Sequence, residues 1–383
     1  MRVMIAGGGT GGHLFPGIAL AEEVVSRHPE NDVVFVGTHR GLEARVVPQN
    51  GFVFEAITSR GLKGMGPWKL MLGLATLPLS FTSAVSLLWR YSPDVVVGVG
   101  GYSSGPVVLA AWLMRIPTAV QEQNALAGLT NRLLGRIVDA AFVSFDAARA
   151  FFPNDNAHLL GNPIRRGLLE NFLRPRDRHK TFTVLVFGGS LGARGLNRRM
   201  LEALPYLADL KGELCIVHQT GAGDLETVQK AYAGSGFDAQ VCEFIEDMST
   251  AYLGADLVVC RAGATTLAEL TVCKKASILV PFPHATDDHQ TVNAMALVDA
   301  GAAKMLREEE LTGELLAKTI RELKNDPAKL GEMQRAAGLL GRPEAAGEIA
   351  NVLSQLCLER WGVLTGQPRT GTPLRPPSKE SRP

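Results

Sequence analysis

A glycine-rich stretch near the start of the chain has the residue types needed to hold a phosphate and to move a proton. Residues 7–13 read GGGTGGH; they follow an apolar run at 3–6 and precede apolar residues at helical spacing, with Pro16 near the expected helix start. Backbone N–H groups of such a loop approach anions closely, and the dipole of the following helix favours negative charge. His13 can exchange protons beside a charged ligand. The stretch predicts an anion site with a candidate general base, although a tight turn with His13 on its rim would use the same glycines.

Gly7, Gly9 and Gly12 also fit G-x-G-x-x-G, the fingerprint of dinucleotide-binding enzymes. That fingerprint requires an acidic residue about 20 residues later, at the end of the second strand, where it binds the ribose. Here the second expected strand, residues 33–36, ends in GTHR, which contains no carboxylate. The match to a nicotinamide-dependent dehydrogenase is therefore weak.

The elements that position these residues alternate between strand and helix, which is typical of doubly wound parallel sheets. The opening pattern recurs about 180 residues later, where a strand at 183–187 leads into GGSLGAR at 188–194. Further strands are expected at 94–99, 117–121, 140–144, 213–219, 239–245, 255–260 and 277–283, and helices at 107–114, 129–134 and 345–361. The sequence therefore predicts an α/β protein of two Rossmann-like domains that face each other across a cleft, with ligands at the carboxyl ends of the strands.

Length, charge and cysteine usage restrict the class of protein. A chain of 383 residues with 46% hydrophobic residues predicts two domains of roughly 150 to 200 residues each. The net charge of +1 argues against a nucleic-acid partner bound by overall charge. The five cysteines form no C-x-x-C pair, which favours a reduced, cytoplasmic protein without a structural zinc. The first residues run directly into a strand, so we expect no signal peptide.

One segment has the length of a membrane span. Residues 70–89 contain no charge, but Pro78 and several hydroxyl residues favour a helix or broken helix packed on the sheet. The preceding residues 60–69, RGLKGMGPWK, mix basic and apolar types and suit contact with an anionic bilayer surface. An ordinary solvated loop would have the same composition.

The second half contains a further anion-site pattern. In residues 261–269, RAGATTLAE, Gly263 and the two threonines suit a turn into a helix N-terminus. Glu269 can accept hydrogen bonds from vicinal hydroxyls, or it can complement the helix dipole. Residues 284–294, HATDDHQTVNA, carry groups that could read a sugar or a base. Their two His and two Asp are poor evidence for a metal, because one loop would supply every ligand.

Six motifs in order carry a resemblance to a known family over about residues 1–362. They are GGTGGH at 8–13, GGYSSGP at 100–106, EQN at 122–124, GNPIR at 161–165, GGSLGAR at 188–194 and RAGATTLAE at 261–269. The chain resembles the MurG family, glycosyltransferases that add N-acetylglucosamine to undecaprenyl-linked muramyl-pentapeptide in peptidoglycan synthesis. The resemblance implies the GT-B fold, with an acceptor- and membrane-facing domain at 1–163, a UDP-sugar domain at 164–344 and a helix at 345–363 that crosses back to the first domain. The Pro-rich tail at 364–383 is expected to be disordered.

The resemblance also implies roles for individual residues. In the second domain, Ser190 would contact the diphosphate of UDP-N-acetylglucosamine, Phe244 and the backbone of Ile245 the uracil, Glu269 the ribose and Gln290 the donor sugar. Ala264, Thr265 and Thr266 would bind the diphosphate through helix N-terminal amides, and Leu267 and Ala268 complete this segment. From the first domain, Thr10, Gly11, Gly12, Asn124 and Arg165 would close over the donor or the acceptor. The chain departs from the family at Gln121, where a His commonly precedes EQN, at Leu191, where Gln is frequent, and in the tail.

The implied reaction is a single displacement. The acceptor 4-hydroxyl attacks the anomeric carbon as UDP leaves, which inverts that centre and gives a β linkage. His13 is the candidate base, and loop amides, a helix N-terminus and Arg165 or Arg194 would stabilise the departing charge. The chain contains no Asp-x-Asp pair, so we expect neither a metal nor another cofactor to be essential.

The implied partners follow from the same resemblance. They are UDP-N-acetylglucosamine, the lipid-linked muramyl-pentapeptide, an anionic membrane surface and cell-wall synthesis and division proteins, with no nucleic acid. The implied location is peripheral, on the cytoplasmic face of the inner membrane. The residues leave two other functions open: a GT-B transferase with a different acceptor, and a non-catalytic nucleotide-sugar sensor.

Overall fold

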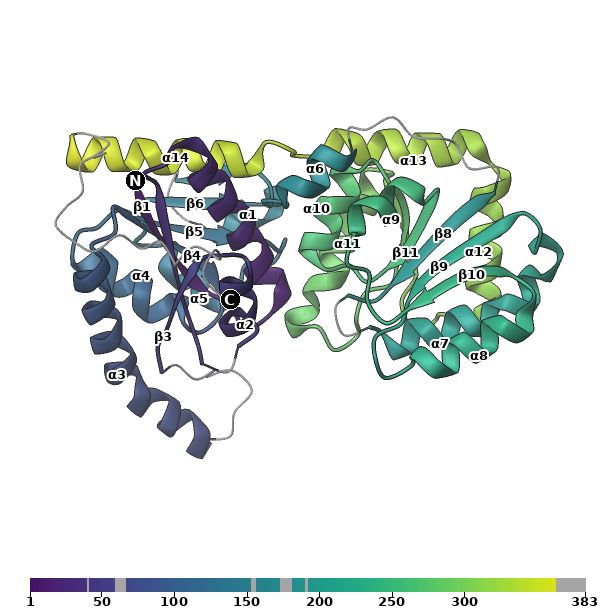
Figure 1. Ribbon diagram of the computed structural model, residues 1–383, viewed down its shortest axis with the longest axis horizontal. Helices are drawn as coiled ribbons and strands as arrows, with labels where there is room; N and C mark the ends of the chain where they lie inside the picture. Colours follow the sequence, from purple (N-terminus) through teal and green to yellow (C-terminus); the bar gives the residue numbers. More distant parts are fainter. Residues whose placement is uncertain (40, 59–66, 153–155, 173–180, 190–191, 363–383) are drawn as a thin grey trace, which may run out of the picture. The chain divides into compact units, whose positions relative to one another are not determined.

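The chain forms two compact units in a computed structural model that describes residues 1–39, 41–58, 67–152, 156–172, 181–189 and 192–362, with the backbone only for 67–77 and 171–172. Unit 1 contains Met1–Arg166 and the C-terminal segment that begins at Glu344; unit 2 contains Gly167–Pro343. Each unit has one parallel β-sheet with helices on its faces (Figure 1). The predicted α/β architecture of two Rossmann-like domains is confirmed.

Unit 1 is built on a seven-stranded sheet. Its strands are β1 (Arg2–Gly7), β2 (Asp32–Gly37), β3 (Val53–Ala56), β4 (Val95–Gly100), β5 (Thr118–Glu122), β6 (Ala140–Val143) and β7 (Ala157–Leu159). Its helices are α1 (Gly11–Arg27), α2 (Glu43–Gln49), α3 (Pro67–Tyr91), α4 (Ser104–Leu113), α5 (Leu129–Leu134) and α14 (Ala345–Trp361), with a 3-10 turn at Asp146–Phe151. The strand order is β3-β2-β1-β4-β5-β6-β7, and all neighbours are parallel.

The sheet of unit 1 is buried on both faces, which explains its near-continuous apolar strands. Ile5 of β1 packs in a core with α1, α2 and α14. Met4, which points to the other face, packs in a core with α3, α4 and α5. The alternation of neighbouring residues between two cores therefore fixes which helices lie on which side.

Helix α3 is continuous from Pro67 to Tyr91 and contains Pro78. Its C-terminal half packs on the sheet through Ala84, Leu87 and Leu88. Among the described helices, none is both long enough and apolar enough for a membrane crossing. The predicted membrane-contact segment lies outside the described residues at 60–66, and the side chains of 67–69 are not described either.

Unit 2 is built on a six-stranded sheet. Its strands are β8 (Phe182–Phe187), β9 (Leu214–Gln219), β10 (Asp238–Cys242), β11 (Leu257–Cys260), β12 (Ala276–Leu279) and β13 (Ala303–Met305). Its helices are α6 (Arg166–Phe172), α7 (Arg194–Ala203), α8 (Leu225–Ser235), α9 (Met248–Gly254), α10 (Ala264–Val272), α11 (His289–Asp299), α12 (Gly313–Asn325) and α13 (Pro327–Leu340), with 3-10 turns at Leu204–Leu210 and Thr286–Asp288. The order is β10-β9-β8-β11-β12-β13, and all neighbours are parallel.

Both sheets reverse their strand order beside their first strand. β1 lies between β2 and β4, and β8 lies between β9 and β11. In open α/β sheets, ligands bind outside the carboxyl ends of the strands at this reversal. The glycine loops after β1, β4 and β8 all begin at such positions.

Several element boundaries differ from the sequence expectation, and the differences at α1, α4 and β12 are described here. α1 begins at Gly11, so Pro16 lies inside the helix rather than at its start, because the Thr10 carbonyl already accepts from Leu14 N–H at 3.1 Å. α4 begins at Ser104 rather than at 107. β12 ends at Leu279, ahead of two prolines that cannot donate to a strand ladder.

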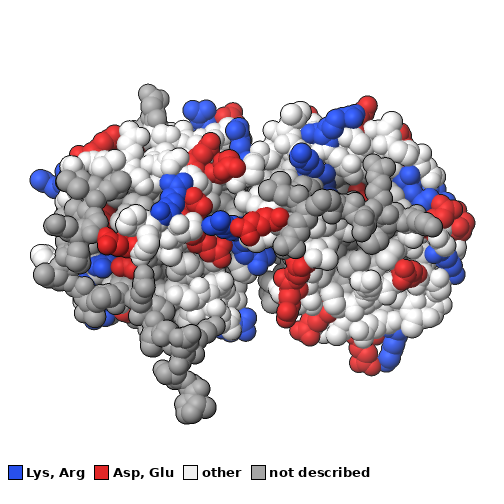
Figure 2. Space-filling model, turned by 45° about the horizontal axis from the view of Figure 1, so that its top comes forward, with Lys and Arg blue, Asp and Glu red and all other residues white. Residues whose placement is uncertain are grey.

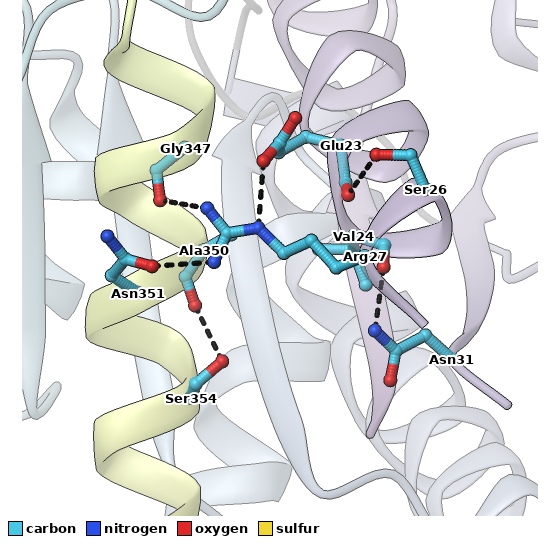
Figure 3. A network of polar contacts seen from close by, with 9 residues as sticks. All are labelled: Glu23, Val24, Ser26, Arg27, Asn31, Gly347, Ala350, Asn351 and Ser354. Atoms are coloured by element: carbon cyan, nitrogen blue, oxygen red, sulfur yellow. Dashed lines mark hydrogen bonds and ion pairs between the residues drawn. The ribbon is translucent and has the colours of Figure 1, made fainter. Parts of the chain in front are cut away.

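The C-terminal helix α14 has the predicted bounds and packs on α1. Arg27 at the end of α1 donates from Nη2 to Gly347 O and from Nη1 to Asn351 Oδ1, both at 2.6 Å, and from Nε to Glu23 Oε1 at 2.8 Å (Figure 3). One guanidinium therefore joins the helix that begins at the first glycine loop to the last helix of the chain.

Candidate active site

The first glycine loop places His13 in the opening turn of α1. Thr10 is extended at φ −132° and ψ 157°, and its carbonyl accepts from His13 N–H at 3.2 Å. The half-buried His13 ring has Nδ1 at 3.4 Å from Gly8 O and 3.4 Å from Thr10 Oγ1. Because a carbonyl oxygen only accepts, the contact with Gly8 favours the proton on Nδ1 and the lone pair on Nε2. The contact with Gly8 therefore favours one orientation and one tautomer of the imidazole.

The loop at 100–106 lies against the loop at 7–13. Gly8 N–H donates to Gly100 O at 3.3 Å. A Cβ on Gly100 would come within 3.0 Å of the His13 ring, and a Cβ on Gly101 within 2.6 Å of Gly8 O. Glycine at these positions lets the imidazole lie directly on backbone.

Asn124 is held by a buried carboxylate of its own motif. Glu122, the last residue of β5, accepts at Oε1 from Asn124 N at 3.0 Å and Nδ2 at 3.3 Å. Its Oε2 accepts from Gly128 N and Asn131 Nδ2, both at 2.9 Å. These donors compensate the buried charge. In the EQN motif the glutamate fixes the loop, and the half-buried asparagine is the residue that can meet a ligand.

Gln121, which replaces the common histidine, has a structural role. Its side chain is 1% exposed, and Nε2 donates to Gly161 O at 3.2 Å. It therefore ties β5 to the GNPIR segment instead of reaching a ligand.

Arg165, at the end of that segment, lies beside α1. Its guanidinium carbon is 5.4 Å from the centre of the Phe15 ring. Burial raises the pKa of Glu22, while the Arg166 backbone N–H and the charge of Arg165 act in the opposite direction. The predicted residues of the first domain thus follow three different strands: Thr10, Gly11 and Gly12 follow β1, Asn124 follows β5 and Arg165 follows β7.

A buried carboxylate that the sequence analysis missed lies under the first loop. Glu43, the first residue of α2, accepts at Oε2 from Gly9 N–H at 2.8 Å and at Oε1 from Thr38 N–H and Oγ1–H, both at 3.0 Å. The GTHR segment at the end of β2 contains no carboxylate. The next helix, α2, places the carboxylate of Glu43 at this edge of the sheet. Gly37 and Gly41, which surround Glu43, are the signal that could have identified it.

The loop at 188–194 in unit 2 is held by a neutral side chain. Gln219, the last residue of β9, donates from Nε2 to Gly189 O at 2.8 Å and accepts at Oε1 from Ile245 N–H at 3.2 Å. Phe244, the neighbour of Ile245, is 51% exposed. Gln219 therefore joins the glycine loop to the predicted uracil segment. Ser190, predicted for the diphosphate, lies outside the described residues.

The N-cap residue of helix α10 is Gly263, which has no side chain to cap the helix. Leu267 N–H donates to Gly263 O at 3.0 Å, so the N–H groups of Ala264, Thr265 and Thr266 precede the first intrahelical bond. This geometry suits an anion. The Leu267 side chain is buried in the core, so only its backbone can serve a ligand, whereas Ala268 is half-buried.

Glu269 lies in the second turn of α10 and is 8% exposed. Its Oε2 accepts from the hydroxyl of the fully buried Tyr252 at 3.0 Å. A tertiary contact from α9 therefore orients this carboxylate, in addition to any interaction with the helix dipole.

Gln290 and Arg261 occupy neighbouring positions on the same sheet edge. Gln290, in the first turn of α11, accepts at Oε1 from Phe282 N–H at 2.9 Å. Arg261 forms an ion pair with Glu308 at 2.5 Å and donates to Val280 O at 3.2 Å, so it acts as a scaffold residue. Within the described ranges, no three His, Cys, Asp or Glu side chains gather as a metal-binding group.

Two family models match the chain. The glycosyltransferase family 28 N-terminal domain matches residues 3–143, and the family 28 C-terminal domain matches residues 183–349. Together they cover the glycine loops of both units.

Relatives and solved structures agree with these matches. The chain is 66% identical over 370 residues to a UDP-N-acetylglucosamine–N-acetylmuramyl-(pentapeptide) pyrophosphoryl-undecaprenol N-acetylglucosamine transferase of Myxococcus xanthus, covering 97% of this chain and 96% of that protein. The crystal structure of Acinetobacter baumannii MurG is 34% identical, with a TM-score of 0.76 over 92% of this chain and 99% of that one.

A more distant structure shares the fold alone. The UDP-GlcNAc 2-epimerase of Neisseria meningitidis is 15% identical, with a TM-score of 0.67 over 93% of this chain and 100% of that one. The family models, the Myxococcus relative and the Acinetobacter structure, together with the motifs described above, show that the chain is a glycosyltransferase of family 28 and belongs to the MurG family.

Proposed function

We propose that this enzyme transfers N-acetylglucosamine from UDP-N-acetylglucosamine to the 4-hydroxyl of the muramyl sugar of undecaprenyl-pyrophosphoryl-muramyl-pentapeptide, with inversion. The observation that carries the proposal is the 66% identity to the Myxococcus relative, whose name states this donor and this acceptor. The geometry of the two units supports a division of labour in the reaction.

Unit 2 is the donor-binding unit in this proposal. The uncapped N-terminus of α10 offers amides to the diphosphate, and Glu269, oriented by Tyr252, accepts from the ribose hydroxyls. Phe244 covers the uracil. Because Ile245 N–H already donates to Gln219, the Ile245 carbonyl is the backbone group that we expect to read the base. Gln290 Oε1 accepts from Phe282, so we expect its Nε2 to donate to the sugar.

Unit 1 supplies the base. Nε2 of His13 takes the proton of the attacking hydroxyl, while the contact of Nδ1 with Gly8 O keeps the ring in the required tautomer. Asn124, fixed by Glu122, and Arg165, placed over Phe15, are the proposed further ligands from this unit.

We also propose a peripheral association with an anionic membrane through α3, α4 and α5. Exposed apolar side chains lie on these neighbouring helices: Leu79, Trp89, Leu113, Leu129 and Leu133. Arg90 and Arg132 lie on the same helices. Apolar side chains beside arginines suit the interface of an anionic bilayer. Cell-wall synthesis and division proteins are the proposed protein partners on this membrane.

On the face drawn in Figure 2, the charge of the described residues does not favour a nucleic acid. On the face drawn in Figure 2, Lys and Arg alternate with Asp and Glu over the described residues. Such a mixture does not produce the basic field that a phosphate backbone attracts.

The reaction is tested directly with radiolabelled UDP-N-acetylglucosamine and a lipid-linked muramyl-pentapeptide. We expect a disaccharide with a β linkage, formed also in EDTA because we expect no essential metal. UDP-N-acetylglucosamine incubated alone should stay unchanged; formation of its 2-epimer would contradict the proposal, as would the absence of transfer to the lipid acceptor.

A further inference from the structure

We infer that Glu43 is a positioning residue for the base: its buried carboxylate holds the first glycine loop in the shape that orients His13. The inference rests on the proposed role of His13.

The carboxylate is fixed by three donors and is almost inaccessible to solvent. Glu43 is 1% exposed, with Gly9 N–H on Oε2 at 2.8 Å and the backbone and hydroxyl of Thr38 on Oε1 at 3.0 Å. Hydrogen bonds to an ionised acceptor are stronger than those between neutral groups. Glu43 therefore ties the loop after β1 to the loop after β2.

The backbone around Glu43 leaves room for this side chain. A Cβ on Gly8, Gly37 or Gly41 would come within 2.4, 2.5 or 2.1 Å of Glu43 side-chain atoms. Gly8 also has φ +141°, which other residues rarely adopt. These three glycines enclose the carboxylate, and the loop packs around it.

Gly8 connects Glu43 to His13. One side of Gly8 is in contact with Glu43, and its carbonyl lies 3.4 Å from His13 Nδ1. Loss of the carboxylate would free the Gly8–Gly9 peptide to rotate and would remove the acceptor that selects the Nδ1–H tautomer.

The corresponding support in unit 2 has different chemistry. Gln219 holds the second loop through the Gly189 carbonyl with a neutral amide, whereas Glu43 uses the Gly9 N–H with a negative charge. A loop that already donates to a carboxylate is less suited to a second anion. This difference supports the proposed roles, with the base at the first loop and the diphosphate in unit 2.

The imidazole itself provides the first test. In the substrate-free protein labelled with 15N-histidine, we expect His13 in the Nδ1–H form, with its signal identified by its loss in His13→Ala. In Glu43→Gln, the signal should shift toward the Nε2–H form that histidine favours in water. An unchanged tautomer in the folded variant would overturn the inference.

Kinetics provide the second test. Gln can accept from Thr38, but its NH2 group then faces Gly9 N–H, so the loop must move. We expect kcat to fall about tenfold to a hundredfold while the KM for UDP-N-acetylglucosamine changes by less than about twofold. The same substitution at the exposed Glu30, Glu30→Gln, is the matched control and should leave both values unchanged. Wild-type kcat in folded Glu43→Gln would also overturn the inference.

A second variant and a measurement without substrate also test the role of Glu43. Should Glu43→Gln not fold, Thr38→Val removes one donor to the same carboxylate and should shift the His13 tautomer in the same direction by a smaller amount; no shift there would overturn the inference. The imidazole spectrum needs no substrate, so it still decides the role of Glu43 if the wild-type protein transfers no sugar and the proposed function fails.

Discussion

Buried side chains outside the proposed ligand contacts hold a backbone group in each of the two glycine loops. Glu43 in unit 1 and Gln219 in unit 2 each reach from a neighbouring strand or helix to the loop after the first strand of their sheet. Each is at least 98% buried, with 1% and 2% exposure. Glu43 is a carboxylate that accepts from the Gly9 N–H, whereas Gln219 is a neutral amide that donates to the Gly189 carbonyl. In the proposed reaction, this difference favours base chemistry at the first loop and anion binding at the loop of unit 2.

His13→Ala is the first prediction at this scale. Because the proposed donor contacts lie in unit 2, we expect kcat to fall about 10² to 10⁴-fold while the affinity for UDP-N-acetylglucosamine changes by less than about twofold. Steady-state kinetics and calorimetry measure the two effects. The exposed His28, changed to Ala, is the control. Unchanged turnover in His13→Ala would remove this residue from the role of base.

Gln219→Glu is the second prediction. The new carboxylate would face the Gly189 carbonyl, which only accepts, and would add negative charge to the proposed diphosphate site. We expect the affinity for UDP to fall about tenfold, equivalent to about 1.4 kcal/mol. Calorimetry with UDP measures the change, and Gln229→Glu on the exposed face of α8 is the matched control. Wild-type affinity in a folded Gln219→Glu protein would contradict the support role.

At the scale of elements, a buried polar network joins β9 to its neighbours. His218 of β9 is 0% exposed; Nδ1 lies 3.1 Å from Tyr232 Oη on α8, and Nε2 lies 3.1 Å from Asn197 Oδ1 on α7. Burial lowers the pKa of His218 from 6.5 to about 4, although Asp224 acts in the opposite direction. The folded protein therefore holds a neutral imidazole where the unfolded chain would be protonated below pH 6.5.

This network predicts a pH-dependent stability. The contribution of His218 is complete above pH 6.5 and is lost as the pH falls from 6.5 to about 4, because the unfolded state binds the proton first. We expect a loss of about 2–3 kcal/mol in the free energy of unfolding of unit 2 by pH 4. Urea unfolding of the wild type and of His218→Gln, whose amide can bond to both neighbours, measures it. Equal pH slopes in the two proteins would show that another group is responsible.

At the scale of the whole molecule, the proposed membrane association depends on the apolar side chains of α3, α4 and α5. We expect Leu113→Glu with Leu133→Glu, two residues that are 56% exposed, to weaken binding to anionic vesicles about tenfold or more. Vesicle sedimentation measures binding, and urea unfolding verifies that stability is unchanged. Leu339→Glu on α13, where the leucine is 87% exposed, is the control. Equal binding by the double variant would place the membrane surface elsewhere, for instance in the segment around Trp68 and Leu70.

Much of this molecule could be predicted from local sequence. The glycine loops after apolar runs identified both Rossmann-like units, and the six motifs identified the family, the donor and the reaction. Helix α14 has the bounds that its apolar spacing predicted. The roles of residues such as Asn124 and Gln290 stay predictions, because each role is a contact with substrate.

The sequence by itself determined the fold class and the chemistry, because strand, glycine loop and helix are signals between adjacent residues. Only the tertiary structure decided which side chains support those loops. Glu43 and Gln219 reach their glycines from other strands and helices, and Tyr252 reaches Glu269 from another helix. Such contacts depend on the order of strands in the sheet, which brings distant segments to one edge. The spacing of residues along the sequence does not indicate them.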